Sequence, residues 1–301
     1  MPLRKDIWRV GIVRKPLRDV LAAGSLADDP VLWLPELPAL HFYADPFGLW
    51  RDGKLYLFVE TYDYWRRRGS IDVLTLDRDL RVQSRRPALH EPWHLSYPFL
   101  IEDGGQTYML PEAFRSGTLT LYRAVDFPTR WEPAARIVLD AVAIDATPIF
   151  HNGMWWLFYT PADSTLSKVA ALHVAFAERL TGPWRVHARN PVRFDPTSAR
   201  PGGTPVVIDG AIVLPVQDCA ETYGGGMRKL TVTKLMPDAF EAEASARFAP
   251  PASRAYVHGL HTLSAAGDVT LIDAKKFEVS AETLASDVGH LFRKMLRRFG
   301  G

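Results

Sequence analysis

A hairpin-forming segment recurs five times along this chain and constrains its fold more than any other feature. The first copy runs over residues 43–61, with apolar and aromatic runs on both sides of an Asp52-Gly53 turn, which is the pattern of a β-hairpin. Four later copies have their turn glycines at 105, 153, 210 and 267. Repeats spaced by 48 to 57 residues, with several strands in each, are typical of a β-propeller.

Further strands are expected after each hairpin. Third strands are predicted at residues 70–76, 118–124, 169–176 and 229–235, and tryptophan-centred outer strands at 131–132 and 182–186. The last repeat shows strands at 256–263, 269–273 and 276–279. The segment Ile7–Val13 belongs to no repeat and is expected to complete the last blade and protect its edge. The predicted fold class is therefore all-β, a five-bladed β-propeller.

The two ends of the chain do not follow the repeat. Residues 14–41 contain four prolines and are expected to form an irregular crossing with one short helical turn. From Ser280, a plausible N-cap, apolar residues follow helical spacing, so we divide the chain into a propeller at 1–279 and a short amphipathic helix at 280–301. Its basic end favours either packing on the propeller or peripheral contact with a membrane or an acidic partner; the cations are Arg293, Lys294, Arg297 and Arg298.

Composition excludes several classes of protein. The 301 residues are 47% hydrophobic and 23% charged, as in soluble globular proteins, and a net charge of +2 predicts no nucleic-acid partner. A single cysteine, Cys219, excludes an internal disulfide. The N-terminal segment lacks the apolar core of a secretory signal, and no apolar run reaches the roughly 18 to 20 residues of a membrane span. We therefore expect a cytoplasmic protein.

Polar residues recur where the innermost strands of a propeller meet at one end of the central channel. The starts of these strands hold Tyr43, Asp45, His94, Ser96, Tyr97, Asp145, Thr147, Arg200, Gly203, His258 and His261. The far ends of the hairpins hold Glu60, Glu112, Thr160, Gln217, Asp218 and Asp273. Each has a structural explanation when taken alone, since an Asp before Pro is commonly a turn residue. A carboxylate inside an apolar strand, such as Asp145, needs a reason to be buried.

Carboxylates that converge from several blades indicate chemistry at a glycosidic bond. The candidate catalytic residues are Asp45, Asp145, Glu112 and Glu60, and the candidate substrate-binding residues are His94, Tyr97, Arg200, Gln217, Asp218 and Tyr43. Flat faces for sugar rings are offered by Tyr62, Tyr64, Trp65, Trp93 and Tyr223. Arg200 and the glycine runs at 202–203 and 224–226 suggest a place for a phosphate or carboxylate group.

Seven short motifs resemble one known family. They are YADPF at 43–47, HLSYPF at 94–99, MLPE at 109–112, IDATP at 144–148, ARPGG at 199–203, VQDC at 216–219 and HTL at 261–263. They are similar to the N-terminal domain of plant glucosamine inositolphosphorylceramide transferase and its stand-alone bacterial relatives, over about residues 7–275. The resemblance implies a five-bladed propeller related to the family 43 glycoside hydrolases.

The resemblance also implies roles for individual residues. Asp45 matches the general base of family 43 and Asp145 the residue that modulates its pKa, while His261 matches a histidine beside an axial calcium ion or water. That divalent cation is the one cofactor suggested. The acid position differs, because Arg200-Pro201-Gly202 stands where the family has Glu-Gly-Pro. Either Glu112 or Glu60 supplies the acid, or a phosphate leaving group departs without protonation.

Three functions stay open, and each expects a sugar or glycoconjugate partner. The first is a carbohydrate-active enzyme of glycan or glycolipid biosynthesis, whose substrate is linked to a nucleotide or lipid phosphate. The second is an inverting glycoside hydrolase. The third is a non-catalytic sugar-binding propeller that partners a glycosyltransferase. Arg200 and the missing export signal favour the first.

Overall fold

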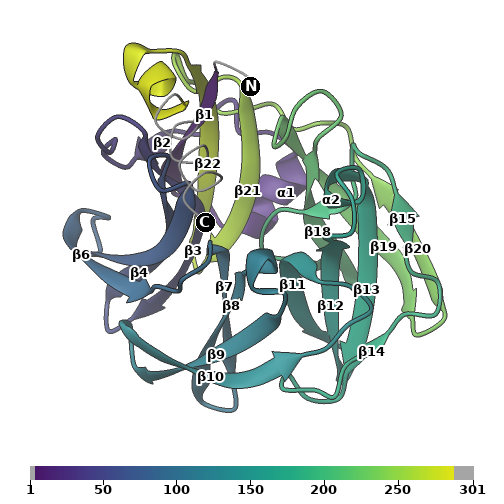
Figure 1. The fold of residues 1–301 in the computed structure, drawn as a ribbon. Coiled ribbons are helices and arrows are strands. Elements are labelled where there is room, and N and C mark those ends of the chain that lie inside the picture. The colour runs from purple at the N-terminus through teal and green to yellow at the C-terminus, as the bar shows by residue number, and fades with distance from the viewer. Residues whose placement is uncertain (1–3, 288–301) are drawn as a thin grey trace, which may run out of the picture.

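The computed structural model describes residues 4–287 and contains five antiparallel sheets arranged around a central axis (Figure 1). Blade 1 consists of β3 (His41–Arg51), β4 (Lys54–Asp63), β5 (Arg68–Leu76) and β6 (Val82–Leu89). Blade 2 consists of β7 (Ser96–Asp103), β8 (Gln106–Glu112), β9 (Leu119–Asp126) and β10 (Arg130–Ile137). The predicted five-bladed propeller is confirmed.

Blades 3 and 4 are less regular. Blade 3 consists of β11 (Ala143–His151), β12 (Met154–Pro161), β13 (Ala171–Ala177) and β14 (Arg185–Val186), and β15 (Arg193–Phe194) also pairs with β13. Blade 4 has a broken inner strand, β16 (Arg200–Pro201) and β17 (Val206–Ile208), followed by β18 (Ala211–Asp218), β19 (Gly226–Met236) and β20 (Ala239–Ala244). The break falls at the glycines of the ARPGG motif.

Blade 5 is closed by the N-terminal segment. Its inner strands are β21 (Gly259–Ala266) and β22 (Val269–Glu278), and β1 (Lys5–Val13) pairs with β22 along its whole length. The predicted closing strand is therefore confirmed, and β2 (Val31–Trp33) adds an unexpected outer strand. The separate strand expected at 276–279 is wrong, because β1 provides the pairing partner that lets β22 run on without a break.

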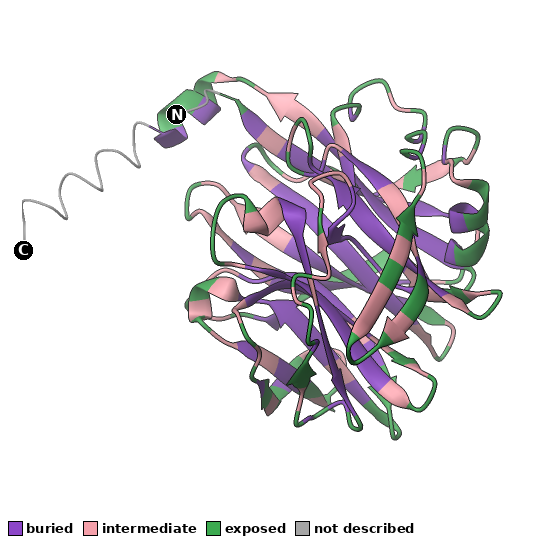
Figure 2. Ribbon diagram, turned by 90° about the vertical axis from the view of Figure 1, so that its right-hand side faces the viewer, coloured by how far each residue is buried: buried purple, intermediate pink, exposed green. Residues whose placement is uncertain are grey.

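The hydrophobic core is divided among the five interfaces between neighbouring blades. One cluster, for example, joins Phe58 and Ile71 of blade 1 to Met109 of blade 2, and another joins Phe158 of blade 3 to Leu214 of blade 4. Buried residues fill the inner strands, and exposed ones gather on the outer strands and loops (Figure 2). Each blade thus buries both of its faces against its neighbours, which holds the inner strand ends in place.

The segments outside the blades are short. The helical turn expected in the crossing is α1 (Leu17–Ala23), which packs against blades 4 and 5 and ends at Gly24 in the left-handed conformation. Ser280 caps the C-terminal helix at 281–287, since its hydroxyl accepts the N–H of Thr283 at 3.3 Å. Arg293, Lys294, Arg297 and Arg298 lie outside the described residues. None of the helices within residues 4–287 has the length and apolarity needed to cross a membrane.

Candidate active site

Bulges in the inner strands turn side chains toward the axis. Pairing between the first two strands shifts register at Asp45 in blade 1, Tyr97 in blade 2 and Asp145 in blade 3. All three have left-handed backbones, with φ of 47°, 45° and 49°. A bulge redirects a side chain, and such a conformation costs a non-glycine residue on the order of 1–3 kcal/mol. The repeat therefore places local strain at the same point of three blades.

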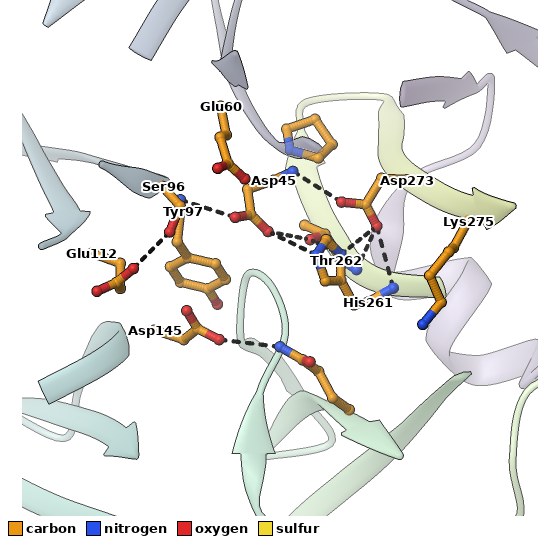
Figure 3. A network of polar contacts seen from close by, with 12 residues as sticks. Asp45, Glu60, Ser96, Tyr97, Glu112, Asp145, His261, Thr262, Asp273 and Lys275 are labelled. Carbon is orange, nitrogen blue, oxygen red and sulfur yellow. Dashed lines mark hydrogen bonds and ion pairs between the residues drawn. The ribbon is translucent and has the colours of Figure 1, made fainter. Parts of the chain in front are cut away.

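Asp45 lies at the junction of blades 1, 2 and 5. Its carboxylate accepts the N–H of Tyr97 and the hydroxyl of Thr262, each at 3.1 Å, and lies 3.6 Å from Nε2 of His261. Nδ1 of His261 is 2.7 Å from Asp273, whose other oxygen accepts the N–H of Asp45 at 2.9 Å (Figure 3). Asp273 therefore holds both His261 and the backbone that presents Asp45.

These contacts tune two ionisable groups. Burial raises the pKa of Asp45 to about 6, against the opposing effect of His261. Burial opposes the charged form of His261, but the carboxylates of Asp273 and Asp45 raise its pKa above the ordinary value. Near neutral pH, Asp45 is thus an ionised carboxylate with a raised pKa, which suits a general base.

A second cluster places two carboxyl groups beside one histidine. Nδ1 of His94 accepts the N–H of Gly69 at 2.8 Å, so the neutral ring carries its proton on Nε2. Nε2 lies 3.7 Å from Glu60 and 3.8 Å from Glu112. Burial, helped by Arg115, lowers the pKa of His94 to about 4, so the ring is neutral at pH 7.

Both glutamates of this cluster favour their protonated form. Burial raises the pKa of Glu112 to about 7, although the N–H of Phe114 at 2.6 Å and the hydroxyl of Ser96 at 2.8 Å oppose the rise. Burial also raises the pKa of Glu60, reinforced by the charges of Asp45 and Glu112. A carboxyl group that keeps its proton near neutral pH is what general acid catalysis requires.

Asp145 has a different environment, built around an ion pair. Its carboxylate accepts Nε of Arg200 at 2.8 Å and Nε2 of Gln217 at 3.1 Å. A second guanidinium nitrogen of Arg200 donates to the carbonyl of Lys168 at 2.7 Å. Arg200 is thus no free fork for a phosphate group, contrary to expectation. Asp145 lies behind it, and its charge makes a smaller contribution than burial to the raised pKa of Asp45.

Four predicted binding residues, Tyr43, Tyr97, Gln217 and Asp218, are not in the lining of the axial cavity. The Tyr97 hydroxyl is buried, 2.9 Å from Thr147 Oγ1, and accepts the N–H of Gly203. Tyr43 packs between blades 5 and 1, because the bulge at Asp45 breaks the two-residue alternation of the strand. Asp218 points to the opposite face from Gln217 and pairs with Arg228 at 2.9 Å. His258 also lies elsewhere, against Phe277.

The glycine runs serve packing rather than phosphate binding. The N–H groups of Gly202, Gly203 and Gly225 are already bonded, to Pro215, Tyr97 and Asp218. A Cβ added to Gly203 would lie 1.8 Å from the carbonyl oxygen of Leu263. Glycine at this position is required because blades 4 and 5 approach each other closely.

A cavity of about 630 Å³ opens at this end of the axis, within the roughly 300–1,000 Å³ usual for small-molecule sites. Its lining includes Asp45, Glu60, His94, Glu112, Arg200 and His261, with the rings of Tyr62, Tyr64 and Tyr223. These six candidate residues therefore meet in one cavity as predicted, whereas Asp145 is absent from the lining and pairs with Arg200. Trp65 and Trp93 are not in this lining.

Two features of the cavity have no counterpart in the predictions. The ring of Trp8, from the closing strand β1, stacks on His261 with centroids 3.7 Å apart. Three cations also line the cavity from loops between the second and third strands of blades 1, 2 and 3: Arg67, Arg115 and Lys168. The recurrence of a cation after the second strand of the first three repeats is the signal that would have found them.

The suggested cation beside His261 does not fit the residues around it. Asp45, His261 and Asp273 each offer a ligand atom, all within 4.8 Å of one another. However, Nδ1 of His261 is bonded to Asp273, and both Asp273 oxygens accept backbone N–H groups. A cation would have to displace these bonds, so the group is better described as a hydrogen-bonded triad.

Comparison with protein families gives a match over most of the chain. The model described as glucosamine inositolphosphorylceramide transferase 1, N-terminal, matches residues 36–257. A protein of Oryza sativa subsp. indica named glucosamine inositolphosphorylceramide transferase 1 is 35% identical over 207 residues, 67% of this chain and 27% of that protein. The Arabidopsis thaliana protein of the same name is 34% identical over 71% of this chain and 28% of its own length. The chain thus spans little more than a quarter of these relatives.

Solved structures show the same fold at low sequence identity. Zg3597, a family 117 glycoside hydrolase from Zobellia galactanivorans, is 14% identical with a TM-score of 0.56, over 83% of this chain and 90% of that one. The catalytic domain of the Coprinopsis cinerea GH62 α-L-arabinofuranosidase is 12% identical with a TM-score of 0.53, over 80% of this chain and 93% of that one. These similarities concern the propeller itself.

Proposed function

Because this chain belongs to the glucosamine inositolphosphorylceramide transferase 1, N-terminal family, we propose that it is a carbohydrate-active enzyme that acts on a glycosidic bond in its axial cavity. One observation supports this above all others. Asp45, with a pKa of about 6, and Glu112, with a pKa of about 7, line the same cavity from different blades. Two carboxyl groups with raised pKa values that face one cavity from different blades match the base and the acid of glycosidic bond cleavage.

In the proposed reaction, Asp45 removes a proton from water or from an acceptor hydroxyl. The oxygen so activated bonds to the anomeric carbon from the face opposite the leaving group, and the bond to the leaving oxygen breaks. Glu112, with Glu60 and the Nε2 proton of His94 beside it, gives its proton to that oxygen. The products have inverted configuration, and proton exchange with solvent resets both carboxyl groups.

The choice of leaving group distinguishes acid catalysis by Glu112 from the alternative, in which a phosphate leaves without being protonated. Glu112→Gln is expected to lower turnover of alkyl glycosides by about 100-fold, because their alkoxide leaves poorly without a proton. It should have little effect on glycosides with an activated aryl leaving group. Equal loss on both substrates would show that Glu112 is not the acid. Product NMR on the same panel tests the predicted inversion.

Glycosyl transfer in glycan or glycolipid synthesis is the second candidate, and the cations at the cavity edge favour it. Transfer to an added alcohol in place of water, or turnover of nucleotide sugars, would support this candidate. The third candidate is a sugar-binding module, for which the rings of Tyr62, Tyr64 and Tyr223 in the cavity lining offer flat faces. Ligand binding without turnover of any glycoside or nucleotide sugar would support the module and overturn the enzyme.

A further inference from the structure

Three loops at equivalent places in successive blades each bring one cation to the edge of the cavity. Arg67 lies between β4 and β5, Arg115 in the short 3-10 turn Phe114–Ser116 between β8 and β9, and Lys168 in α2 (Ser167–Ala170) between β12 and β13. The repeat thus places positive charge in the lining of the cavity that also contains the Glu60–His94–Glu112 cluster. We call these three residues the rim cations.

Two of the rim cations have no carboxylate partner among the residues that the structure describes. Within residues 4–287, neither Arg115 nor Lys168 has a carboxylate oxygen within the 4.0 Å of an ion pair. Arg115 donates to the carbonyl of Arg67 at 3.4 Å, and the Lys168 ammonium lies 4.3 Å from the ring centre of Phe114. Phe114 holds Lys168 by a cation–π contact. Neighbouring cations repel one another, so their convergence here favours an anionic ligand.

The third rim cation already binds a carboxylate from the end of the described chain. Oδ1 of Asp287, in the helix at 281–287, lies 2.8 Å from Arg67 and 2.5 Å from Lys5. Its Oδ2 is buried and has no hydrogen-bond partner among residues 4–287. An acidic oxygen is therefore accommodated at the rim, but the carboxylate uses only one of its two oxygens.

We propose that the rim cations form a subsite for a phosphate-ester group of the substrate, separate from the glycosidic bond that is processed, and that Asp287 occupies part of it in the free protein. This inference rests on the proposed function. Three donors on three loops suit a group with three or four oxygens better than a carboxylate with two. The substrate class is then a glycoconjugate that carries a phosphate ester, free or in a lipid headgroup.

The subsite is joined to the candidate acid by one short turn. The N–H of Phe114 donates to Glu112 at 2.6 Å, while its ring contacts Lys168. A phosphate held by Arg115 and Lys168 therefore sets the depth at which the rest of the substrate reaches Glu112. Arg200 is engaged with Asp145 and the Lys168 carbonyl. The phosphate-binding role predicted for Arg200 is therefore assigned to the rim cations.

Binding of D-glucose 6-phosphate, whose phosphate ester lies away from the anomeric carbon, tests the subsite by calorimetry without turnover. Arg115→Gln/Lys168→Gln should weaken binding roughly tenfold or more for each lost charged contact, and Asp287→Asn should strengthen it by releasing Arg67. Arg179→Gln/Lys54→Gln removes the same charge outside the cavity lining and is the matched control. Equal loss in the control, or unchanged affinity in the rim variant, overturns the proposal.

A second arm identifies where the phosphate comes from. Binding to phosphatidylglycerol vesicles but not to phosphatidylcholine vesicles or glucose 6-phosphate would assign the subsite to a lipid headgroup, provided the rim variant loses this binding. No binding in either arm by a folded wild-type protein overturns the subsite. Because Asp45→Asn should keep phosphate binding whatever its activity, failure of the subsite and failure of the proposed reaction give different results.

Discussion

Asp45 and Asp145 occupy the same place in blades 1 and 3, yet their neighbours differ completely. Both sit at an inner-strand bulge with φ near 48°, and both are buried. Asp145 faces a guanidinium and an amide, so its charge is balanced inside the protein. The carboxylate of Asp45 faces His261, one backbone N–H and one hydroxyl donor. It also faces the open cavity, and further carboxyl groups lie nearby.

The comparison shows that the repeat places an Asp at the same point of each of these blades, whereas side chains from neighbouring blades determine its charge environment. A paired carboxylate stabilises the ring, because removal of one partner leaves an uncompensated buried charge. In Asp45, burial outweighs the opposing charge of His261, so its pKa is raised and the carboxylate suits proton transfer. We therefore propose that Asp45 is the reactive member of the pair and Asp145 the structural one.

The largest expected effect is on activity at Asp45. Asp45→Asn should lower turnover roughly 10²- to 10⁴-fold, the usual contribution of a general base, with ligand affinity nearly unchanged. The matched control is Asp52→Asn in the exposed hairpin turn. Wild-type turnover in Asp45→Asn would remove the base from the mechanism and leave the binding module as the better explanation.

Asp145→Asn is expected to act on stability instead. Loss of this carboxylate leaves Arg200 buried without its anion, so the free energy of unfolding in urea should fall by about 3–5 kcal/mol. Asp145→Asn/Arg200→Met should recover most of that loss, because no unpaired charge remains. If the single variant unfolds like the wild type, the ion pair is not what stabilises this side of the ring.

The pH dependence of the free energy of unfolding should reveal the raised pKa of Asp45. The pKa of Asp45 rises from 3.8 to about 6 on folding, so the native state binds more protons than the unfolded state between these values. Stability should therefore fall as pH increases from about 4 to 6, by about 1–3 kcal/mol. Urea unfolding across this range should give a flatter profile for Asp45→Asn. An identical slope in both proteins would contradict the raised pKa.

The smallest expected effect concerns the support of Asp45 through His261. Trp8→Phe keeps an aromatic ring but loses part of the stacking on His261, which is worth about 0.5–1.5 kcal/mol. Turnover should fall only a few-fold, and the acid limb of the pH–rate profile should move. Trp33→Phe, outside the cavity lining, is the control and should leave that limb in place.

Hairpin periodicity by itself determined the number of blades and the ring closure, because each repeat is a local pattern of alternating residues and turn glycines. It also placed Asp45, Glu60 and Glu112 at strand ends near one axis. Local patterning does not extend to contacts between blades. The bulges that break alternation moved Tyr43 away from the cavity, and this is visible only in the strand register.

Tertiary structure alone decided which polar residues pair with each other. The partners of Asp145, Arg200 and Gln217, lie 55 and 72 residues further along the chain, and the hydrogen bond between Asp273 and the Asp45 backbone spans 228 residues. Trp8 reaches the cavity because ring closure brings the first strand beside the last. The ionisable groups could be identified from the sequence. Their protonation states could not, because these depend on neighbours that are distant in sequence and come together only when the blades assemble.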